Sequence, residues 1–241
     1  MLIVQKFGGT SVADSQRLQA VAAIIARTVR RGCRVVAVVS AQGDSTDVLL
    51  KKAVELGHPS PREMDALLST GELISAPLLA MALMAQGIDA VSLTGWQAGL
   101  RTDGKHQDAK LIGFDPRRIR QALRHHQVAV VAGFQGIGPD GDVTTLGRGG
   151  SDTTAAALAV YLRADRCQIF TDVDGVYDKD PNLHPDAVKY AYLPYEEMDR
   201  LIQAGAQVLH DKCLDTARAH NLTLEVLSSL TGNPGTLVGP G

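Results

Sequence analysis

The segment "KFGGTS" combines charged and small residues in a way that could bind phosphate. It places Lys6 at the end of an apolar run and two glycines, Gly8 and Gly9, directly after it. Glycines leave backbone N–H groups open to an anion, and the lysine adds a positive point charge. The order differs from that of a Walker loop, where the lysine follows the glycines. Gly-Gly alone would favour a plain strand-to-helix turn, but with Lys6 before it and Thr10 after it we interpret the segment as a phosphate contact.

A second segment, "GRGGSD", places a basic residue before two glycines and an acid after them. Ser151 could cap a helix whose free N–H groups and dipole attract an anion. Gly149 and Gly150 leave room for a ligand, and Arg148 could pair with a carboxylate through two hydrogen bonds. Asp152 could hold a cation, either a lysine or a metal. A simply capped helix would explain the serine and the acid but not the residues before them.

Two further segments carry weaker signals. "TDVDGVYDKDP" has the acid spacing of a calcium loop but lacks its downstream glutamate, so we interpret it as a nucleotide-binding loop in which Tyr177 and Pro181 frame a base. "STGELIS" places Glu72 beside a helix glycine, which costs about 1 kcal/mol relative to alanine and hints at a close approach. The residues alone favour a solvated glutamate here. The histidines lack metal spacing and are interpreted as surface residues.

The elements that must position these segments alternate along the chain. Apolar runs predict strands, and amphipathic patterns with glycine stops predict helices, the first of them capped by Asp14. We expect a mostly helical stretch over 62–86 that Pro77 kinks or splits, a glycine-rich loop over 135–150, and two helical stretches around Gly205. The expected strands are 2–7, 33–40, 88–93, 128–134, 167–172 and 222–228, and the other expected helices are 15–31, 44–57, 116–124 and 151–162.

This alternation predicts an α/β fold with a parallel sheet and helices on both faces. Four unusual segments that follow strands would then meet at one edge of the sheet, where such folds bind ligands: "KFGGTS", "SAQGDSTD", "GFQGIG…GRGGSD" and "TDVDGVYDKDP". We expect a single domain over 1–241, with an amino-acid-binding lobe over about 1–140 and a nucleotide-binding lobe over about 141–241. The boundary is placed in the loop at 139–150.

Composition fits a globular chain with no bias toward polyanions. The 241 residues are 45% hydrophobic and 21% charged, with a net charge of −2. That charge favours neither nucleic acid nor an acidic membrane. We expect no signal peptide and no apolar run long enough to span a bilayer. The three cysteines form no CxxC pair and are interpreted as buried thiols, which predicts a cytoplasmic location.

The motifs together resemble a known family. "VQKFGGTSV", "SAQGDSTD", "STGE", "LTGWQAG", "GFQG", "TTLGRGGSDTTA" and "TDVDGVYDKDP" follow the order found in aspartokinases. The sequence resembles their catalytic domain, within the amino acid kinases, over nearly all of 1–241. The resemblance implies a three-layer αβα sandwich around a mainly parallel central sheet. It also implies transfer of the γ-phosphoryl group of ATP, with Mg²⁺, to the side-chain carboxylate of L-aspartate, the first step towards lysine, threonine and methionine.

The same resemblance implies roles for individual residues. Lys6 and Asp152 match catalytic positions, the lysine on the phosphates and the acid organising that lysine and the metal. No residue is assigned as a direct metal ligand. Positions that match substrate contacts are Thr46, Glu72, Arg148, Gly149, Gly150 and Ser151, with Glu72 opposite the ammonium group. Positions that match nucleotide contacts are Lys6, Phe7, Gly8, Gly9, Ser40, Thr171, Asp172, Val176, Tyr177, Asp178, Lys179, Asp180, Pro181 and Lys212.

Two alternatives stay open at this point. One is a kinase for another small acid or a nucleotide, and the other is a catalytically weak ligand-binding module. Aspartokinases usually continue into ACT domains, and we expect none before the terminal "NPGTLVGPG". The expected partners are L-aspartate and ATP, with no nucleic acid and no membrane, and a homodimer through the catalytic lobes is left open.

Overall fold

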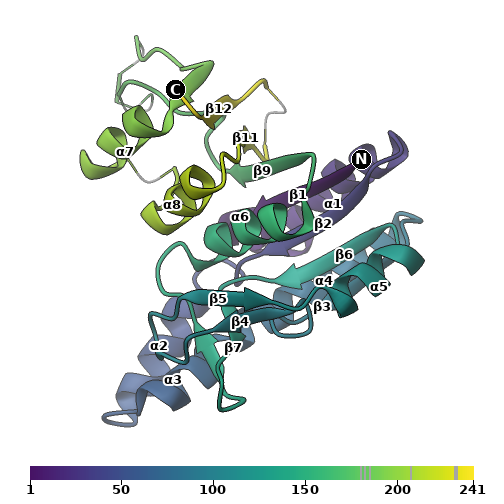
Figure 1. Ribbon diagram of the computed structural model, residues 1–241, viewed down its shortest axis with the longest axis vertical. Coiled ribbons are helices and arrows are strands. Elements are labelled where there is room, and N and C mark those ends of the chain that lie inside the picture. The colour runs from purple at the N-terminus through teal and green to yellow at the C-terminus, as the bar shows by residue number, and fades with distance from the viewer. Residues whose placement is uncertain (180, 182, 185, 207, 231–232) are drawn as a thin grey trace.

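A computed structural model describes residues 1–241 except 180, 182, 185, 207, 231 and 232, and within the described residues its largest sheet has eight strands (Figure 1). In spatial order these are β10 (Tyr192–Pro194), β12 (Thr236–Gly239), β11 (Leu224–Ser228), β9 (Arg166–Thr171), β1 (Leu2–Phe7), β2 (Arg34–Val39), β6 (Val128–Ala132) and β3 (Ala90–Leu93). β11 and β12 pair antiparallel, and the other neighbours pair parallel. The predicted, mainly parallel sheet is therefore confirmed.

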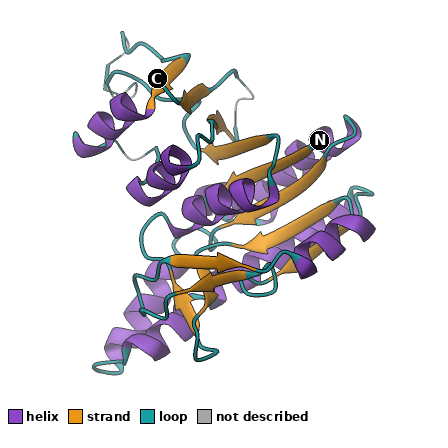
Figure 2. Cartoon of the chain, in the orientation of Figure 1, coloured by secondary structure: helices purple, strands orange, loops and turns teal. Residues whose placement is uncertain are grey.

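Helices cover both faces of this sheet (Figure 2). On one face lie α1 (Ser15–Arg30) and α4 (Thr70–Ala85), and on the other lie α5 (Arg117–His125), α6 (Gly150–Leu162), α7 (Tyr195–Gln203) and α8 (Asp211–Ala219). Successive side chains along a strand belong to two different apolar clusters. Val35 packs in the cluster that contains the α1 and α4 side chains, whereas Val36 packs in the one that contains those of α5 to α8. This period of two, buried on both sides, builds the predicted three-layer αβα sandwich.

The first helix shows how the sequence specifies an element. The Asp14 side chain accepts a hydrogen bond from the backbone N–H of Arg17 at 2.8 Å, which is the predicted N-cap. The helix then buries a stripe of apolar residues against the sheet, and Gly32 follows its end with a φ of +83°. The buried residues of the stripe are Leu18, Val21, Ala22, Ile25, Ala26 and Val29.

A second, smaller sheet lies beside the first and was not predicted. It contains β5 (Leu111–Phe114), β4 (Leu100–Thr102), β7 (Gln135–Ile137) and β8 (Val143–Thr145) in that order. The expectation of a loop throughout 135–150 is therefore wrong. These strands are only three or four residues long and carry glycines and threonines, so they show no alternating pattern. Tertiary contacts define them, such as the 2.6 Å hydrogen bond between Thr102 and Thr144.

The helical stretch at 62–86 divides at a different place from the one predicted. α3 (Pro61–Leu68) ends at Ser69, whereas Pro77 lies within α4. The expectation that no run could span a bilayer is also wrong by length and composition, because Pro61–Ala85 covers 25 residues and includes an 18-residue window with a mean hydropathy of 1.6. Half of that window is buried inside the fold, and α4 packs on α1 and β6. A core helix meets the same criteria, so this stretch is no argument for a membrane.

The cysteines are only partly as expected. Cys167 and Cys213 are buried, and burial raises the pKa of both thiols. Cys33 is partly exposed, because it lies in the short turn between α1 and β2 rather than inside the strand. The reading of all three as buried thiols is therefore corrected for Cys33.

Candidate active site

The carboxyl ends of four parallel strands lie side by side. Phe7 at the end of β1 pairs with Val39 of β2 and with Phe170 of β9, and Val39 pairs with Ala132 of β6. The segments that follow these strands therefore leave the sheet at one edge, as predicted. This is the edge at which open α/β sheets bind ligands.

Lys6 and Asp152 meet at this edge. The Lys6 ammonium lies 2.7 Å from the Asp152 carboxylate, and their side chains are only 12% and 6% exposed. The same ammonium lies 3.5 Å from the point that a Cβ on Gly8 would occupy. The first glycine turn, which continues as a short 3-10 helix η1 (Gly9–Val12), and the start of α6 therefore face each other. The prediction that Asp152 holds a cation is confirmed, and the cation in this structure is a lysine.

The start of α6 differs from the prediction in its cap. Gly149 is the N-cap residue, with a φ of +67°, and no side chain caps the helix. Ser151 does not cap the helix, because it already lies in the first turn and its hydroxyl packs 2.7 Å from the Cβ position of Gly133. A Cβ on Gly149 would lie 2.3 Å from the Cβ of His210. Gly149 therefore accommodates a neighbouring side chain, that of His210, which is half-buried and lines a cavity beside the start of α6.

Glu72 is buried, not solvated. Its side chain is 4% exposed, one oxygen accepts a hydrogen bond from the Ala41 N–H at 2.9 Å, and the other has no hydrogen-bond partner among the described residues. Burial raises the pKa of Glu72 to about 8, although the Ala41 N–H opposes the rise. Gly71 explains the close approach, since its Cβ position lies 2.6 Å from the Cβ of Ala41. A buried acid with a free oxygen is suited to a cationic ligand group.

Two adjoining cavities continue from this edge. One, of about 590 Å³, is lined by the second glycine-containing loop, including Tyr177 and Pro181. The other, of about 530 Å³, is lined by Arg148, His210 and Lys212. Gly205 and Ala206, in the turn after α7, line both cavities, which we call the cleft. Of the predicted nucleotide contacts, the first cavity is lined by Thr171, Asp172, Val176, Tyr177, Asp178, Lys179 and Pro181.

The remaining predicted residues lie at or near the same edge. The backbone N–H of Ser40, directly after β2, donates to the carbonyl of Phe7 at 3.2 Å. Thr46 lies in the first turn of α2 (Ser45–Glu55), next to the turn that contacts Glu72. Arg148 has an exposed side chain, which leaves it accessible to a ligand. Asp180, also predicted to contact the nucleotide, lies outside the described residues.

Replacing Gly149 with alanine is expected to destabilise the fold by about 2–4 kcal/mol, because a Cβ adds left-handed strain and a collision with His210. Gly141 is a matched control, since it has a φ of +84° and no atom within 4 Å of its Cβ position. Gly141→Ala should carry the left-handed strain alone, about 1 kcal/mol. Denaturant unfolding measures both, and equal losses would contradict the packing account.

The comparisons with known proteins agree with this geometry. The sequence profile of the amino acid kinase family matches residues 1–228. The chain therefore belongs to the amino acid kinase family. It is 50% identical over 238 residues to an aspartokinase of Geobacillus stearothermophilus, covering 98% of this chain and 58% of that protein. The chain thus spans a little over half the length of such curated relatives.

Solved structures show the same likeness. An aspartate kinase from Synechocystis matches with a TM-score of 0.88 at 48% identity, over 100% of this chain and 40% of that one. E. coli aspartokinase III in complex with aspartate and ADP matches with a TM-score of 0.89 at 27% identity, over 100% of this chain and 65% of that one. The fold is therefore the amino acid kinase fold.

Proposed function

We propose that this chain carries the catalytic site of an aspartate kinase, which transfers the γ-phosphoryl group of ATP to the side-chain carboxylate of L-aspartate. The observation that carries the proposal is the buried Lys6–Asp152 pair between the glycine turn and the start of α6. The names of the similar proteins support aspartate as the acceptor. The product would be 4-phospho-L-aspartate, the first intermediate towards lysine, threonine and methionine.

Charge is the main obstacle to this reaction, because a carboxylate must approach a phosphate. No general base is needed, since the attacking carboxylate is ionised at neutral pH. Lys6 would draw charge from the transferred group, and Asp152 holds its ammonium in place. Arg148 would bind a substrate carboxylate and Glu72 the substrate ammonium. Catalysis would then consist of alignment and charge neutralisation.

The donor set at this edge fits a Mg²⁺ that arrives with ATP. The described residues contain no group of three or more His, Cys, Asp or Glu side chains that could hold a metal ion alone. Mg²⁺ in kinases is commonly held by substrate phosphates and one or two carboxylates, and Asp152 supplies a carboxylate beside Lys6. When bound, the ion would supply neutralising charge to the phosphates.

A coupled assay for ADP tests the proposal, with L-aspartate, acetylglutamate and uridylate offered separately. We expect ADP formation that depends on L-aspartate. Turnover with either other substrate and none with aspartate would replace the proposal with another kinase of this fold. ATP binding without turnover on any acceptor would favour a ligand-binding module.

Arg148→Ala is expected to raise the KM for aspartate by about tenfold or more with a smaller change in kcat, because a charge-assisted contact to the bound substrate is lost. Steady-state kinetics with varied aspartate measures this. Arg120→Ala, an exposed arginine on α5, is the control and should leave the KM unchanged. An unaltered aspartate KM in Arg148→Ala would show that Arg148 does not bind the aspartate.

A cytoplasmic location and a homodimer through the catalytic lobes are further proposals from the sequence. The first rests on composition and cysteine usage. The second is checked by light scattering of the purified chain, where a mass of twice 25.6 kDa would support it and a mass of 25.6 kDa would exclude it.

A further inference from the structure

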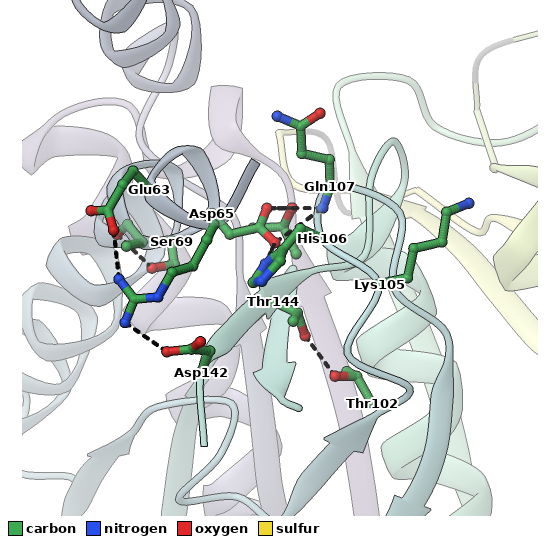
Figure 3. A network of polar contacts seen from close by, with 12 residues as sticks. Glu63, Asp65, Ser69, Thr102, Lys105, His106, Gln107, Asp142 and Thr144 are labelled. Atoms are coloured by element: carbon green, nitrogen blue, oxygen red, sulfur yellow. Dashed lines mark hydrogen bonds and ion pairs between the residues drawn. The ribbon is translucent and has the colours of Figure 1, made fainter. Parts of the chain in front are cut away.

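Asp65 on α3 is a buried carboxylate that the proposed reaction does not use. Its side chain is fully buried, and both oxygens accept hydrogen bonds (Figure 3). Thr145 Oγ1 donates to Oδ1 at 2.5 Å, His106 Nδ1 donates to Oδ2 at 2.8 Å, and the Gln107 N–H lies 3.0–3.1 Å from both oxygens. Burying a carboxylate is costly unless donors surround it, so this cluster fixes the groups that supply the donors.

Two of the three donor residues, His106 and Gln107, lie in a backbone segment that needs such support. Gln107 has a φ of +67°, a left-handed conformation that is unfavourable for a residue with a side chain. Two consecutive residues, His106 and Gln107, bind the same carboxylate. Next to them, the Ala109 N–H donates to the carbonyl of Thr145 at 2.9 Å. Asp65 thus ties the 106–109 segment to α3 and to β8, and it sets where Asp108 lies.

Asp108 in turn holds a lysine of the cleft. Its carboxylate pairs with the ammonium of Lys212, which also donates to the carbonyl of Leu146 at 2.7 Å. Gly147 lies beside them, with its Cβ position 3.1 Å from the Gln107 carbonyl and 3.5 Å from the Lys212 ammonium. Gly147 leads directly into Arg148. An ammonium has three donors, so two fixed partners leave one N–H for a ligand oxygen.

We propose that Asp65 is a positioning residue for nucleotide binding. Through the 106–108 segment and Asp108, it places Lys212 and the turn before Arg148 so that the ammonium meets the phosphates of the nucleotide. The inference rests on the proposed function, since it assumes that a nucleotide occupies the cleft. Asp65 itself touches no substrate, and removing it should act only through Lys212 and its neighbours.

The test is ADP binding by calorimetry, in the full chain, for Asp65→Asn alone and in a Lys212→Met background. The asparagine keeps the shape but carries an NH₂ group that cannot accept the surrounding hydrogen bonds. We expect Asp65→Asn to weaken ADP binding by about tenfold alone and by less than about twofold when Lys212 is already replaced, because coupled residues are not additive. Asp89→Asn is the matched control: Asp89 also pairs with a histidine, His126 at 2.9 Å, but it is 55% exposed and outside the cleft.

The result that would overturn the proposal is an equal loss of ADP affinity in both backgrounds, or no loss in either. The first would make Asp65 a general structural residue, and the second would make it irrelevant to the cleft. If Asp65→Asn does not fold, Asp108→Asn decides instead, because Asp108 is 51% exposed and its replacement leaves the buried cluster intact. It should show the same loss and the same dependence on Lys212, and tighter ADP binding would contradict the proposal.

The role of Asp65 and the proposed function can be tested independently of each other. ADP affinity is measured without aspartate or turnover. If the chain binds ADP as expected but phosphorylates another acceptor, the aspartate assignment fails and the role of Asp65 stands. If aspartate turnover is present and Asp65→Asn binds ADP normally, only the role of Asp65 fails.

Discussion

Replacing Lys6 with methionine is expected to lower kcat by about 10²- to 10³-fold, because one fixed positive group at the transferring phosphoryl is lost. The aspartate KM should change far less, since the proposed function assigns Lys6 to the phosphates and not to aspartate. Steady-state kinetics with saturating ATP and varied aspartate separates the two effects. An increase in KM with an unchanged kcat would remove Lys6 from the reaction centre.

A stability measurement must accompany this variant. Lys6→Met leaves Asp152 buried without its cation, which can destabilise a protein by about 3–5 kcal/mol. The double variant Lys6→Met with Asp152→Asn removes that uncompensated charge and should recover much of the stability without recovering turnover. Lys52→Met, on α2, is the control and should retain both. Recovery of turnover in the double variant would show that Lys6 acts only on the fold.

Replacing Glu72 with glutamine is expected to raise the aspartate KM by about 100-fold. It should also abolish the pH dependence of kcat/KM for aspartate. A charged partner of a bound ammonium can contribute about 3 kcal/mol to the free energy of binding when water is excluded. In the wild-type chain Glu72 has a pKa of about 8, so near neutral pH most of the free protein holds it protonated. Binding an ammonium requires the ionised form and releases the proton. The wild-type kcat/KM for aspartate should therefore rise towards pH 8, by up to tenfold per pH unit.

The same group predicts the pH dependence of stability. The folded pKa of about 8 lies above the reference value of 4.5, so the folded state binds more protons between these values. Unliganded wild-type protein should lose stability as pH rises from about 5 to 8, by at most about 1.4 kcal/mol per pH unit. Glu72→Gln should lack this contribution, which thermal unfolding at several pH values measures. A parallel loss in both proteins would assign the effect to other groups.

Much of the fold follows from local signals. The apolar runs of β1, β2, β6 and β9 predicted parallel strands, and parallel strands have their carboxyl ends at one edge. The Lys6 turn and the start of α6 were therefore expected at the same edge, where Lys6 and Asp152 form an ion pair. The ends of α1 were also predictable from local signals. The Asp14 side chain accepts a hydrogen bond where the helix begins, and the left-handed Gly32 follows where it ends.

The features that were missed depend on distant contacts. The strands of the small sheet are too short to show a period, so pairing alone identifies them. Glu72 looked solvated, because the neighbouring helix glycine hinted at a close approach but did not identify Ala41, 31 residues away, as the contact. His210 and Asp65 gave no local signal, since their partners lie 61 and 41 residues away, at Gly149 and His106. The glycine at 149 was the one available hint, because a residue without a Cβ leaves room for a close neighbour.

The most direct test of the central claim is trapping of the acyl phosphate with hydroxylamine. The chain is incubated with ATP, Mg²⁺, L-aspartate and hydroxylamine, and aspartyl hydroxamate and ADP are both quantified. Phosphorylation of the side-chain carboxylate predicts one hydroxamate for each ADP in the wild type and almost none in Lys6→Met. ADP release without hydroxamate, or equal hydroxamate from both proteins, would contradict a site in which Lys6 directs phosphoryl transfer to aspartate.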